Sequence, residues 1–531
     1  MSITPSSDDN VKRRGLLQSS AVVGSATMLS RVLGLIRDMV LANLVGASSN
    51  ADAFFIAFKI PNFLRRLFAE GAFAQAFVPV LSDTRERGGL VAVKALVDRI
   101  AGALGGTLLL LTAFIMLASP WVATLFAPGF MRDPQKLQLT AELIKLTFPY
   151  LFFISMTGFA GAILNTYGRF SVPAFTPVLL NLSLIGAAIF AAPNFEEPVF
   201  ALAWGVLVAG VLQMMFQLPS LYRLELLPRP TWDLGHPGVH RVMTLMVPAL
   251  FGVSVSQINL LLDTVLASLL PGGSVSWLYY SDRLTELPLG VFGIAIATVI
   301  LPALSTHRVR AETEAFGETL DWAIRLVLLI AVPAMAALFL LAGPILTALF
   351  QYGEFSPGDV TKATYSLRAY TFGLGAFMLI KVLAPGFYAR QNMKTPVKIG
   401  IIAMVANMVL NPLLVFPLLW QFDLGHVGLA LATSIAAWLN AGLLYRGLRR
   451  ENVLRPSAAW SGFILRLLVA VAVMSAVVFW LTPELAIWTD WSWLLRGSAM
   501  LGICSAGGFV YILTLLFAGM RISDFRGPSH T

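Results

Sequence analysis

Apolar stretches about as long as a bilayer is thick recur along almost the whole chain. We count about fourteen, each of roughly 20 residues and separated by clusters of Gly, Pro, Asn or charged residues. They are centred near residues 30, 66, 108, 152, 181, 210, 255, 289, 332, 376, 408, 437, 472 and 508. Because a backbone in lipid must satisfy its own hydrogen bonds, such stretches are expected to be helices. The sequence therefore predicts an all-α polytopic membrane protein with about 14 transmembrane helices.

The composition excludes a soluble globular protein. Of the 531 residues, 57% are hydrophobic and 12% are charged. Because charged residues make up about 25% of a typical soluble domain, this chain cannot hide its apolar surface in one core. Cys504 is the single cysteine and lies in an apolar run. We therefore expect no intrachain disulfide and no cysteine metal site.

The N-terminal residues have the order of a signal peptide, in which a basic cluster precedes an apolar stretch. The cluster KRRGLL also faintly resembles a twin-arginine signal. However, no A-x-A cleavage site ends the apolar part, and the helical pattern continues without a break. We therefore interpret residues 1–17 as a cytoplasmic tail and residue 18 as the start of the first span.

Basic residues distinguish alternate connections between the predicted spans. One set of connections carries nearly all of the loop Lys and Arg, whereas the other set has Arg132, Lys136 and Lys362. Under the positive-inside rule the basic set faces the cytoplasm, which places both termini there. This distribution gives a membrane-topology reason for the net charge of +9, and we expect no nucleic-acid partner.

Two pairs of segments recur at a separation of about 224 residues. LASPWVATLF at 117–126 matches LAGPILTALF at 341–350, and FVPVLSD at 77–83 matches ILPALST at 300–306. Six predicted spans lie between equivalent helices, and an even number gives both halves the same orientation. Chance similarity between Leu-rich helices is the alternative. The repeat predicts two parallel six-helix lobes, which is a transporter architecture.

The domain organisation follows from this repeat. We predict an N-terminal lobe at 18–225, a cytoplasmic linker at 226–238 and a C-terminal lobe at 239–450. Two further helices occupy 451–520, and residues 521–531 form a cytoplasmic tail.

Charged residues recur inside the first two predicted spans, although each costs about 2.5–3.5 kcal/mol at a helix centre. In MLSRVLGLIRDMVLANLVGA, Arg31 and Asp38 lie seven residues apart on nearly one face, and Arg37 precedes Asp38. The second span has the same spacing within its charged set, which consists of Asp52, Lys59, Arg65, Arg66 and Glu70.

The eighth predicted span, equivalent to the second, contains YYSDRLTELPLG. Asp282 and Glu286 are four residues apart, and Arg283 can pair with Glu286. One interpretation is that all these charges form buried ion pairs that lock helices together. The other is that the carboxylates act in a cavity or its gating. These carboxylates are Asp38, Asp52, Glu70, Asp282 and Glu286.

Cations outnumber carboxylates on these helix faces, which favours a hydrated, positively charged cavity over a set of matched pairs. The candidate substrate-binding residues are Arg31, Arg37, Arg65 and Arg283. Guanidinium groups bind phosphate and carboxylate oxygens in a bidentate fork. The sequence therefore predicts an anionic, phosphorylated cargo.

No motif for ATP hydrolysis or metal catalysis occurs in the sequence. There is no G-x-x-x-x-G-K-[ST] loop, and the five histidines lie in predicted loops or at the terminus. The seventh span places Asn259 and Asp263 at i and i+4, and the eleventh does so with Asn407 and Asn411. These oxygen ligands predict a candidate site for a coupling cation, Na⁺ or H⁺. Interhelical hydrogen bonding is the alternative.

Several long segments together resemble one known family. They are SRVLGLIRD, DAFFIAFKIPNFLRRLFAEGAFAQAFVPVLSD, ILNTYGRFSVPAFTPVLLN, GSVSWLYYSDRLTELPLGVFGIAIATVILPALS and LAPGFYARQNMKTPVK. The chain resembles the MurJ (MviN) family of lipid II flippases, in the multidrug/oligosaccharidyl-lipid/polysaccharide (MOP) exporter superfamily. The resemblance covers nearly the whole chain apart from its two ends.

The resemblance implies a flippase of the bacterial inner membrane that serves peptidoglycan synthesis and has no catalytic residues. It implies two lobes around a cationic cavity, with the last two helices forming a groove for the polyprenyl tail of lipid II. The family arginines match Arg31, Arg37, Arg65 and Arg283, and its acidic residues match Asp52 and Glu286. Expected partners are lipid II and membrane lipids, with peptidoglycan glycosyltransferases as candidate neighbours.

Three other functions remain open from the residues alone. A multidrug exporter of soluble cations would need a cavity rich in carboxylates and aromatic residues, which the arginine excess disfavours. A membrane enzyme would need a metal triad or nucleophile elbow, and neither occurs in the sequence. A flippase for another lipid-linked glycan is distinguished from a lipid II flippase by the resemblance.

Overall fold

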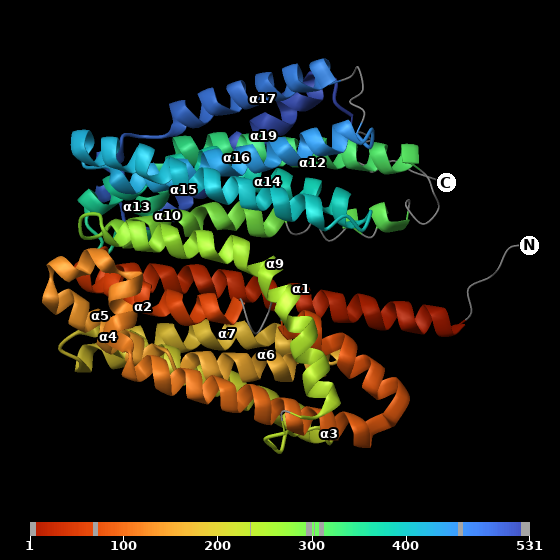
Figure 1. Ribbon diagram of the computed structural model, residues 1–531. Helices are drawn as coiled ribbons and strands as arrows, with labels where there is room; N and C mark the ends of the chain where they lie inside the picture. Colours follow the sequence, from red (N-terminus) through yellow and green to blue (C-terminus); the bar gives the residue numbers. More distant parts are fainter. Residues whose placement is uncertain are drawn as a thin grey trace, which may run out of the picture. The chain divides into compact units, whose positions relative to one another are not determined.

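The computed structural model describes most of the chain, and the backbone it describes is helical apart from connecting turns and loops (Figure 1). The described residues are 7–66, 73–233, 235–293, 300–301, 303–306, 313–454 and 460–521. The chain divides into two compact units, Met1–Leu269 and Leu270–Thr531.

The first unit is built on helices that pack both against neighbours distant in sequence and, for α7 and α8, against the next long helix in the chain. Helix α1 packs on α7, α2 on α5, α3 on α6 and α9, and α8 on both α6 and α7. The bounds are α1 (Ser7–Val45), α2 (Ser49–Leu64), α3 (Ala74–Leu117), α4 (Ser119–Phe126), η2 (Pro128–Arg132), α5 (Pro134–Thr147), α6 (Tyr150–Thr166), α7 (Ser171–Gly186), η3 (Ala187–Ala191), η4 (Ala192–Asn194), α8 (Pro198–Arg223) and α9 (Pro237–Ser268).

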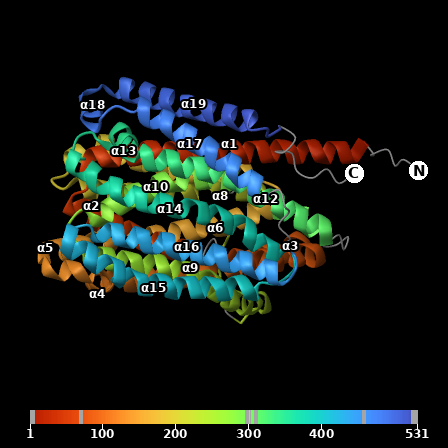
Figure 2. The same cartoon turned by 90° about the horizontal axis from the view of Figure 1, so that it is seen from above.

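In the second unit α14 is the central helix, and it packs against α10, α12 and α16. Helix α15 packs on α16, and α17 packs on α19 and α12, as both ribbon views show for the α17–α19 pair (Figures 1 and 2). The bounds are α10 (Ser274–Pro288), η5 (Leu289–Gly293), α12 (Thr313–Leu340), α13 (Ala342–Phe350), α14 (Pro357–Tyr388), α15 (Lys394–Phe422), α16 (Gly425–Arg450), α17 (Trp460–Leu481), α18 (Leu485–Asp490) and α19 (Trp493–Phe517).

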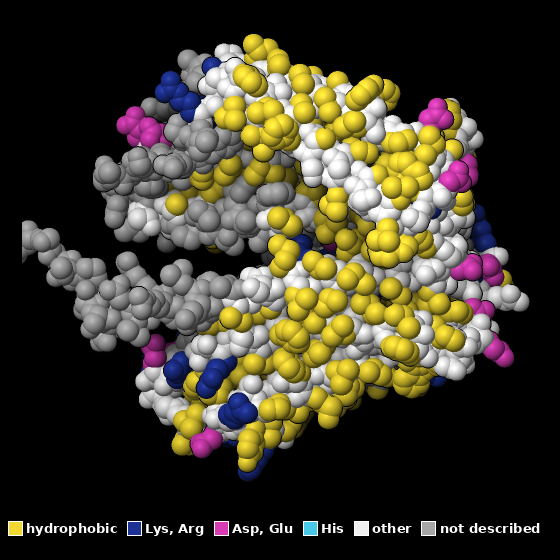
Figure 3. Space-filling model, turned by 180° about the vertical axis from the view of Figure 1, so that it is seen from behind, with side chains coloured by type: hydrophobic (Ala, Val, Ile, Leu, Met, Phe, Trp, Pro, Cys, Tyr) yellow, Lys and Arg dark blue, Asp and Glu magenta, His cyan; other side chains and the backbone are white. Residues whose placement is uncertain are grey.

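Large apolar side chains lie on the outside of the helices as well as in their cores. Leu110, Phe114 and Leu117 on α3 and Trp480 on α17 are exposed, and hydrophobic side chains cover much of the face in Figure 3. Ten segments among the described residues are long and apolar enough to cross a membrane. The prediction of an all-α polytopic membrane protein is therefore confirmed.

Four predicted spans are not among these ten segments. They correspond to α1, α2, α9 and α10. Three of these helices, α1, α2 and α10, carry the charged faces of the first, second and eighth predicted spans. The count of fourteen stays a prediction. The ten that qualify are α3, the α5–α6 pair, α7 with η3 and η4, α8, α12, α14, α15, α16, α17 and α19.

The repeated segments adopt the same local structure in both units. The chain breaks after α3 at Ala118 (φ −89°, ψ 9°) and after α12 at Leu341 (φ −91°, ψ 9°), and each break starts a short helix. Thus LASPWVATLF becomes α4 and LAGPILTALF becomes α13. This matched geometry supports the parallel repeat.

The unit boundary differs from the predicted lobe boundary. Helix α9 was expected to open the C-terminal lobe at residue 239, whereas the compact units divide at Leu269. The physical reason is that α9 packs along α3, and Arg241 on α9 pairs with Asp83 on α3 at 2.7 Å. The functional division into lobes stays a prediction.

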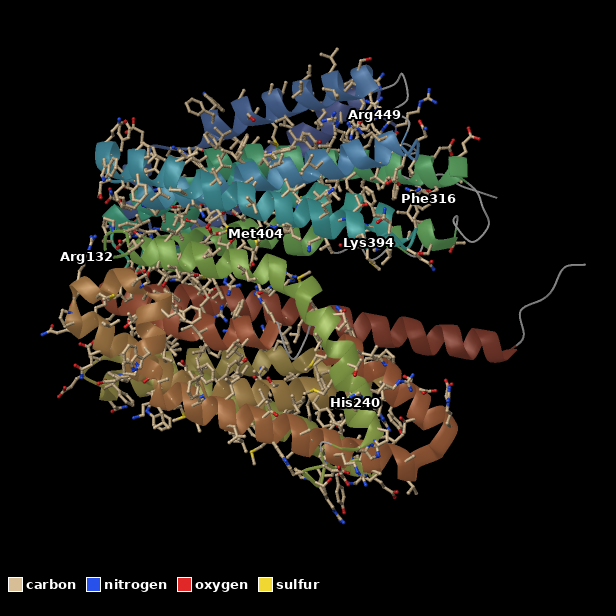
Figure 4. All side chains as sticks on the ribbon, in the orientation of Figure 1. Arg132, His240, Phe316, Lys394, Met404 and Arg449 are labelled. Carbon is tan, nitrogen blue, oxygen red and sulfur yellow. The ribbon has the colours of Figure 1, made fainter. Side chains whose placement is uncertain are left out.

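Side chains from the predicted cytoplasmic connections lie at one end of each unit (Figure 4). In the second unit Lys394 and Arg449 lie at the same end, and in the first unit Arg132 and His240 lie at opposite ends. This arrangement agrees with the predicted alternation of connections. Of the cations predicted on the other side, Lys136 pairs with Asp52 and Lys362 pairs with Asp423.

Candidate substrate-binding site

Arg37 and Asp38 form a buried cluster that fastens α1 to α7. Arg37 donates through Nη2 and Nε to Asp38 Oδ1, at 2.7 and 3.0 Å, and through Nη1 to Asn181 Oδ1 at 3.1 Å. Asn181 in turn donates to the Ser30 carbonyl at 2.9 Å. Arg37 is 6% exposed and Asp38 is 3% exposed. This geometry supports the interpretation of Asp38 as part of a helix-locking ion pair.

Asp52 on α2 is likewise buried against a cation from another helix. Lys136 of α5 lies with its Nζ 3.3 Å from Asp52 Oδ2 and 3.9 Å from the centroid of the Phe130 ring. Two desolvated charges of opposite sign stabilise each other only as a pair. The contact therefore favours a structural role for Asp52 over a free cavity carboxylate.

Arg31 differs from Arg37 although both lie on α1. Its side chain is half-buried, and no described residue forms an ion pair with it. A guanidinium inside a membrane helix keeps its charge and needs water or an anion. Arg31 is therefore suited to contact an anionic substrate.

Arg65 lies where α2 changes its winding. Residues 65 and 66 have π-helical geometry, directly after the α-helix that contains Pro61, and Arg65 Nε donates to Asn62 Oδ1 at 3.4 Å. Such π turns widen a helix locally and are frequent at functional sites. Glu70 lies outside the described residues, so its predicted role stays a prediction.

In the second unit, α10 presents its charges on a more open face. Arg283 Nη1 lies 2.9 Å from Glu286 Oε2, with the two side chains 33% and 43% exposed. Arg283 also lies 5.1 Å from the Tyr279 ring centroid, and Asp282 is exposed. The predicted Arg283–Glu286 ion pair is present, and both of its side chains are partly accessible to solvent.

The opposite face of α10 fixes the helix to α14. Ser281 donates to the Ala363 carbonyl at 2.9 Å, and Ser281 and Thr285 are buried. After Pro288 the chain continues as the π-helix η5. Both second helices of the repeat therefore change to π-helical geometry shortly after a proline, at Arg65 after Pro61 and at Leu289 after Pro288.

The candidate cation residues fall in both units. In the second unit Asn411 Nδ2 donates to Asn407 Oδ1 at 2.7 Å, and Asn407 Nδ2 donates to Thr433 Oγ1 at 3.2 Å. Both asparagines are buried. Asp263 is half-buried on α9 in the first unit. Within α15 and α16 the contacts agree with interhelical hydrogen bonding, and Thr433 is a member that sequence spacing missed.

The structure adds residues that helix spacing alone did not indicate. Asn181 and Lys136 complete the two buried clusters of the first unit. Both are far from their partners in sequence, and only the packing of α7 on α1 and of α5 on α2 brings them together. Among the residues that the structure describes, no three His, Cys, Asp or Glu side chains gather as metal ligands would.

Two helical units that share a repeated helix break, and that hold ten segments able to cross a membrane among the described residues, define a transporter. A solved structure titled lipid II flippase MurJ, inward closed conformation, is similar to this chain with a TM-score of 0.78 and 26% identity, covering 93% of this chain and 98% of that chain. A solved inward-facing multidrug resistance MATE family transporter of the MOP superfamily matches at a TM-score of 0.65 and 16% identity, over 82% and 98% of the chains. The second match shows the shared fold.

Sequence comparisons identify the family. The family model for lipid II flippase MurJ matches residues 41–496. A probable lipid II flippase MurJ of Vibrio cholerae is 50% identical over 521 residues, covering 97% of this chain and 98% of the relative. The lipid II flippase MurJ of Burkholderia cenocepacia is 42% identical over 509 residues, covering 95% and 96%. The chain therefore belongs to the lipid II flippase MurJ family of transporters and is not an enzyme.

Proposed function

We propose that this protein moves lipid II, the undecaprenyl-diphosphate-linked MurNAc-pentapeptide-GlcNAc, from the cytoplasmic to the periplasmic leaflet for peptidoglycan synthesis. The observation that carries the proposal is that Arg31 on α1 and Arg283 on α10 are both partly exposed in a chain of the lipid II flippase MurJ family. A diphosphate is the part of lipid II that such groups bind best.

The four arginines have different proposed roles, of which three are substrate contact and one is structural. Arg31, Arg65 and Arg283 hold the diphosphate and the sugar-pentapeptide head in a central cationic cavity, while the undecaprenyl chain stays in lipid. Arg37 is the least accessible of the four, because Asp38 and Asn181 occupy its donors. Its main effect is to fix the course of α1 and with it the position of Arg31. No bond is made or broken during transport.

Alternating access requires an energy source, and we propose the membrane potential or an ion gradient. Asp263, Asn407 and Asn411 are the candidate ligands for a coupling Na⁺ or H⁺. Replacing Asp263 with Asn removes its charge and should reduce the sensitivity of transport to the cation gradient. Unchanged sensitivity in that variant would leave these residues with interhelical hydrogen bonding alone.

The proposal also places the protein in the cell. We propose the bacterial inner membrane, with both termini in the cytoplasm and α17 and α19 beside the lipid tail. Peptidoglycan glycosyltransferases, which consume lipid II, are the proposed neighbours.

The test is a flipping assay in cells depleted of their own lipid II flippase. An external enzyme that cleaves only periplasm-exposed lipid II reports transport as soluble product. Wild type should yield product, and Arg283→Ala at equal abundance should yield little. Arg390→Ala is the matched control, since Arg390 forms a surface ion pair with Glu451 in the same unit. Absence of product from well-folded wild type would point to another cargo.

A further inference from the structure

A proline inside α12 removes one backbone hydrogen bond in the middle of a membrane helix. Pro333 has no N–H, so the carbonyl of Leu329, four residues earlier, loses its helical donor. Water cannot replace the donor in a dry helix interior. The carbonyl therefore needs a partner from another helix.

Tyr511 of α19 supplies that partner. Its hydroxyl donates to the Leu329 carbonyl at 2.7 Å, and Tyr511 and Leu329 are 9% and 6% exposed. The bond joins the C-terminal pair α17–α19 to the position where α12 lost its own bond. A phenol thus replaces a backbone N–H.

The first unit contains the same arrangement at a different helix. Pro61 in α2 removes the helical donor of the Ala57 carbonyl, and Thr147 of α5 lies with its Oγ1 3.1 Å from that oxygen. Thr147 is buried, and its Oγ1 also lies 2.9 Å from the Leu143 carbonyl and 3.5 Å from the Ile144 carbonyl, so one proton is shared among three acceptors. In contrast, no described side chain donates to the carbonyl four residues before Pro177, Pro219 or Pro385.

Two further contacts hold the C-terminal pair against α12 and α13, one on each side of the proline. Trp460 Nε1 donates to Asp321 Oδ1 at 2.7 Å, before Pro333. After it, buried Arg496 donates through Nη1 to the carbonyls of Thr347 and Gln351, at 3.0 and 3.1 Å. Because the pair contacts α12–α13 before, at and after Pro333, a change in the bend of α12 must strain or break one of these contacts.

We propose that Tyr511 is a positioning residue for transport, which sets the bend of α12 at Pro333 and thereby couples that bend to the α17–α19 pair. The coupling to transport rests on the proposed lipid II function, whereas the bend itself does not. The Thr147 contact at Pro61 serves the same purpose for α2, which leads into Arg65.

A double-mutant cycle with Tyr511→Phe and Pro333→Ala tests the proposal. Tyr511→Phe should lower the flipping rate by about threefold, the effect of one interhelical hydrogen bond. The Pro333→Ala substitution restores the backbone N–H, so adding Tyr511→Phe to it should change the rate no further. Additive losses would overturn the proposal. Tyr365→Phe is the matched control, because Tyr365 is exposed on α14.

The bend can be measured without any lipid II. Spin labels at the exposed positions Glu314 and Phe339 lie on opposite sides of Pro333. Their distance distribution should broaden in Tyr511→Phe and stay narrow when Pro333→Ala is also present. An unchanged distribution in Tyr511→Phe would overturn the proposal, even if wild type flips another cargo. If Pro333→Ala does not fold, the cycle of Thr147→Val with Pro61→Ala applies the same criterion to α2.

Discussion

The charged faces of α1 and α2 and that of α10 look alike in sequence but differ in their surroundings. In the first unit Asp38 and Asp52 are almost fully buried and face Arg37 and Lys136. In the second unit the Arg283–Glu286 pair is one-third to nearly one-half exposed. We therefore propose that a charged pair is structural where it is buried between helices, as at Asp52 and Lys136, and available to a substrate where it is partly exposed, as at Arg283 and Glu286.

The carboxylates illustrate this difference most clearly. Removing one partner at a time should therefore lower stability most at the buried pairs and least at the exposed pair. If the comparison is right, the losses should follow burial rather than the number of charges removed.

Asp52→Ala should have the largest effect, because it leaves Lys136 buried without its counterion. Breaking a buried pair typically costs about 3–5 kcal/mol, so the thermal midpoint and the amount of protein in the membrane should both fall. Adding Lys136→Met removes the orphaned charge and should recover most of the loss. If Asp52→Ala alone leaves the melting curve of the purified protein unchanged, Asp52 is not part of a structural pair.

Asn181→Leu should have an intermediate effect. It removes the amide that accepts from Arg37 and donates to Ser30, and an unsatisfied buried donor costs about 1–3 kcal/mol. The α1–α7 contact should loosen, which cysteine crosslinking between these helices can measure. Asn194→Leu is the control, since Asn194 is exposed and bonds only within its own turn. Equal crosslinking in Asn181→Leu and wild type would contradict this role.

Glu286→Gln should have the smallest effect on stability. Exposed pairs contribute about 0–1 kcal/mol, so the melting curve should barely move. Flipping should be reduced if Glu286 orients Arg283 toward the substrate, and Glu318→Gln on the exposed part of α12 gives a comparison for loss of one carboxylate. A large drop in thermal stability would show that the α10 pair is structural after all.

Much of the fold could be predicted because lipid imposes simple rules on sequence. Apolar length predicts helices, and LASPWVATLF and LAGPILTALF predict the matched helix breaks at Ala118 and Leu341. The packing of α9 against α3 could not be predicted, because it depends on both helices and not on any property of α9 alone.

The candidate site was predictable only at the level of helix faces. Spacing within one helix places Arg31 with Asp38 and Arg283 with Glu286, because both periods are local. It cannot identify Asn181, Lys136 or Tyr511, since each comes from a helix far away in sequence. Contacts with such distant residues determine which charged side chains are held in buried structural clusters.

The most direct test of the central claim compares transport by variants from the two regions in the external lipid II cleavage assay. Arg31→Ala and Arg283→Ala should each lose most of their product at wild-type abundance. The double variant Asp52→Ala/Lys136→Met should keep most of its product, because only a structural pair is replaced. Full transport by both arginine variants, or loss of transport in a well-folded double variant, would contradict the account.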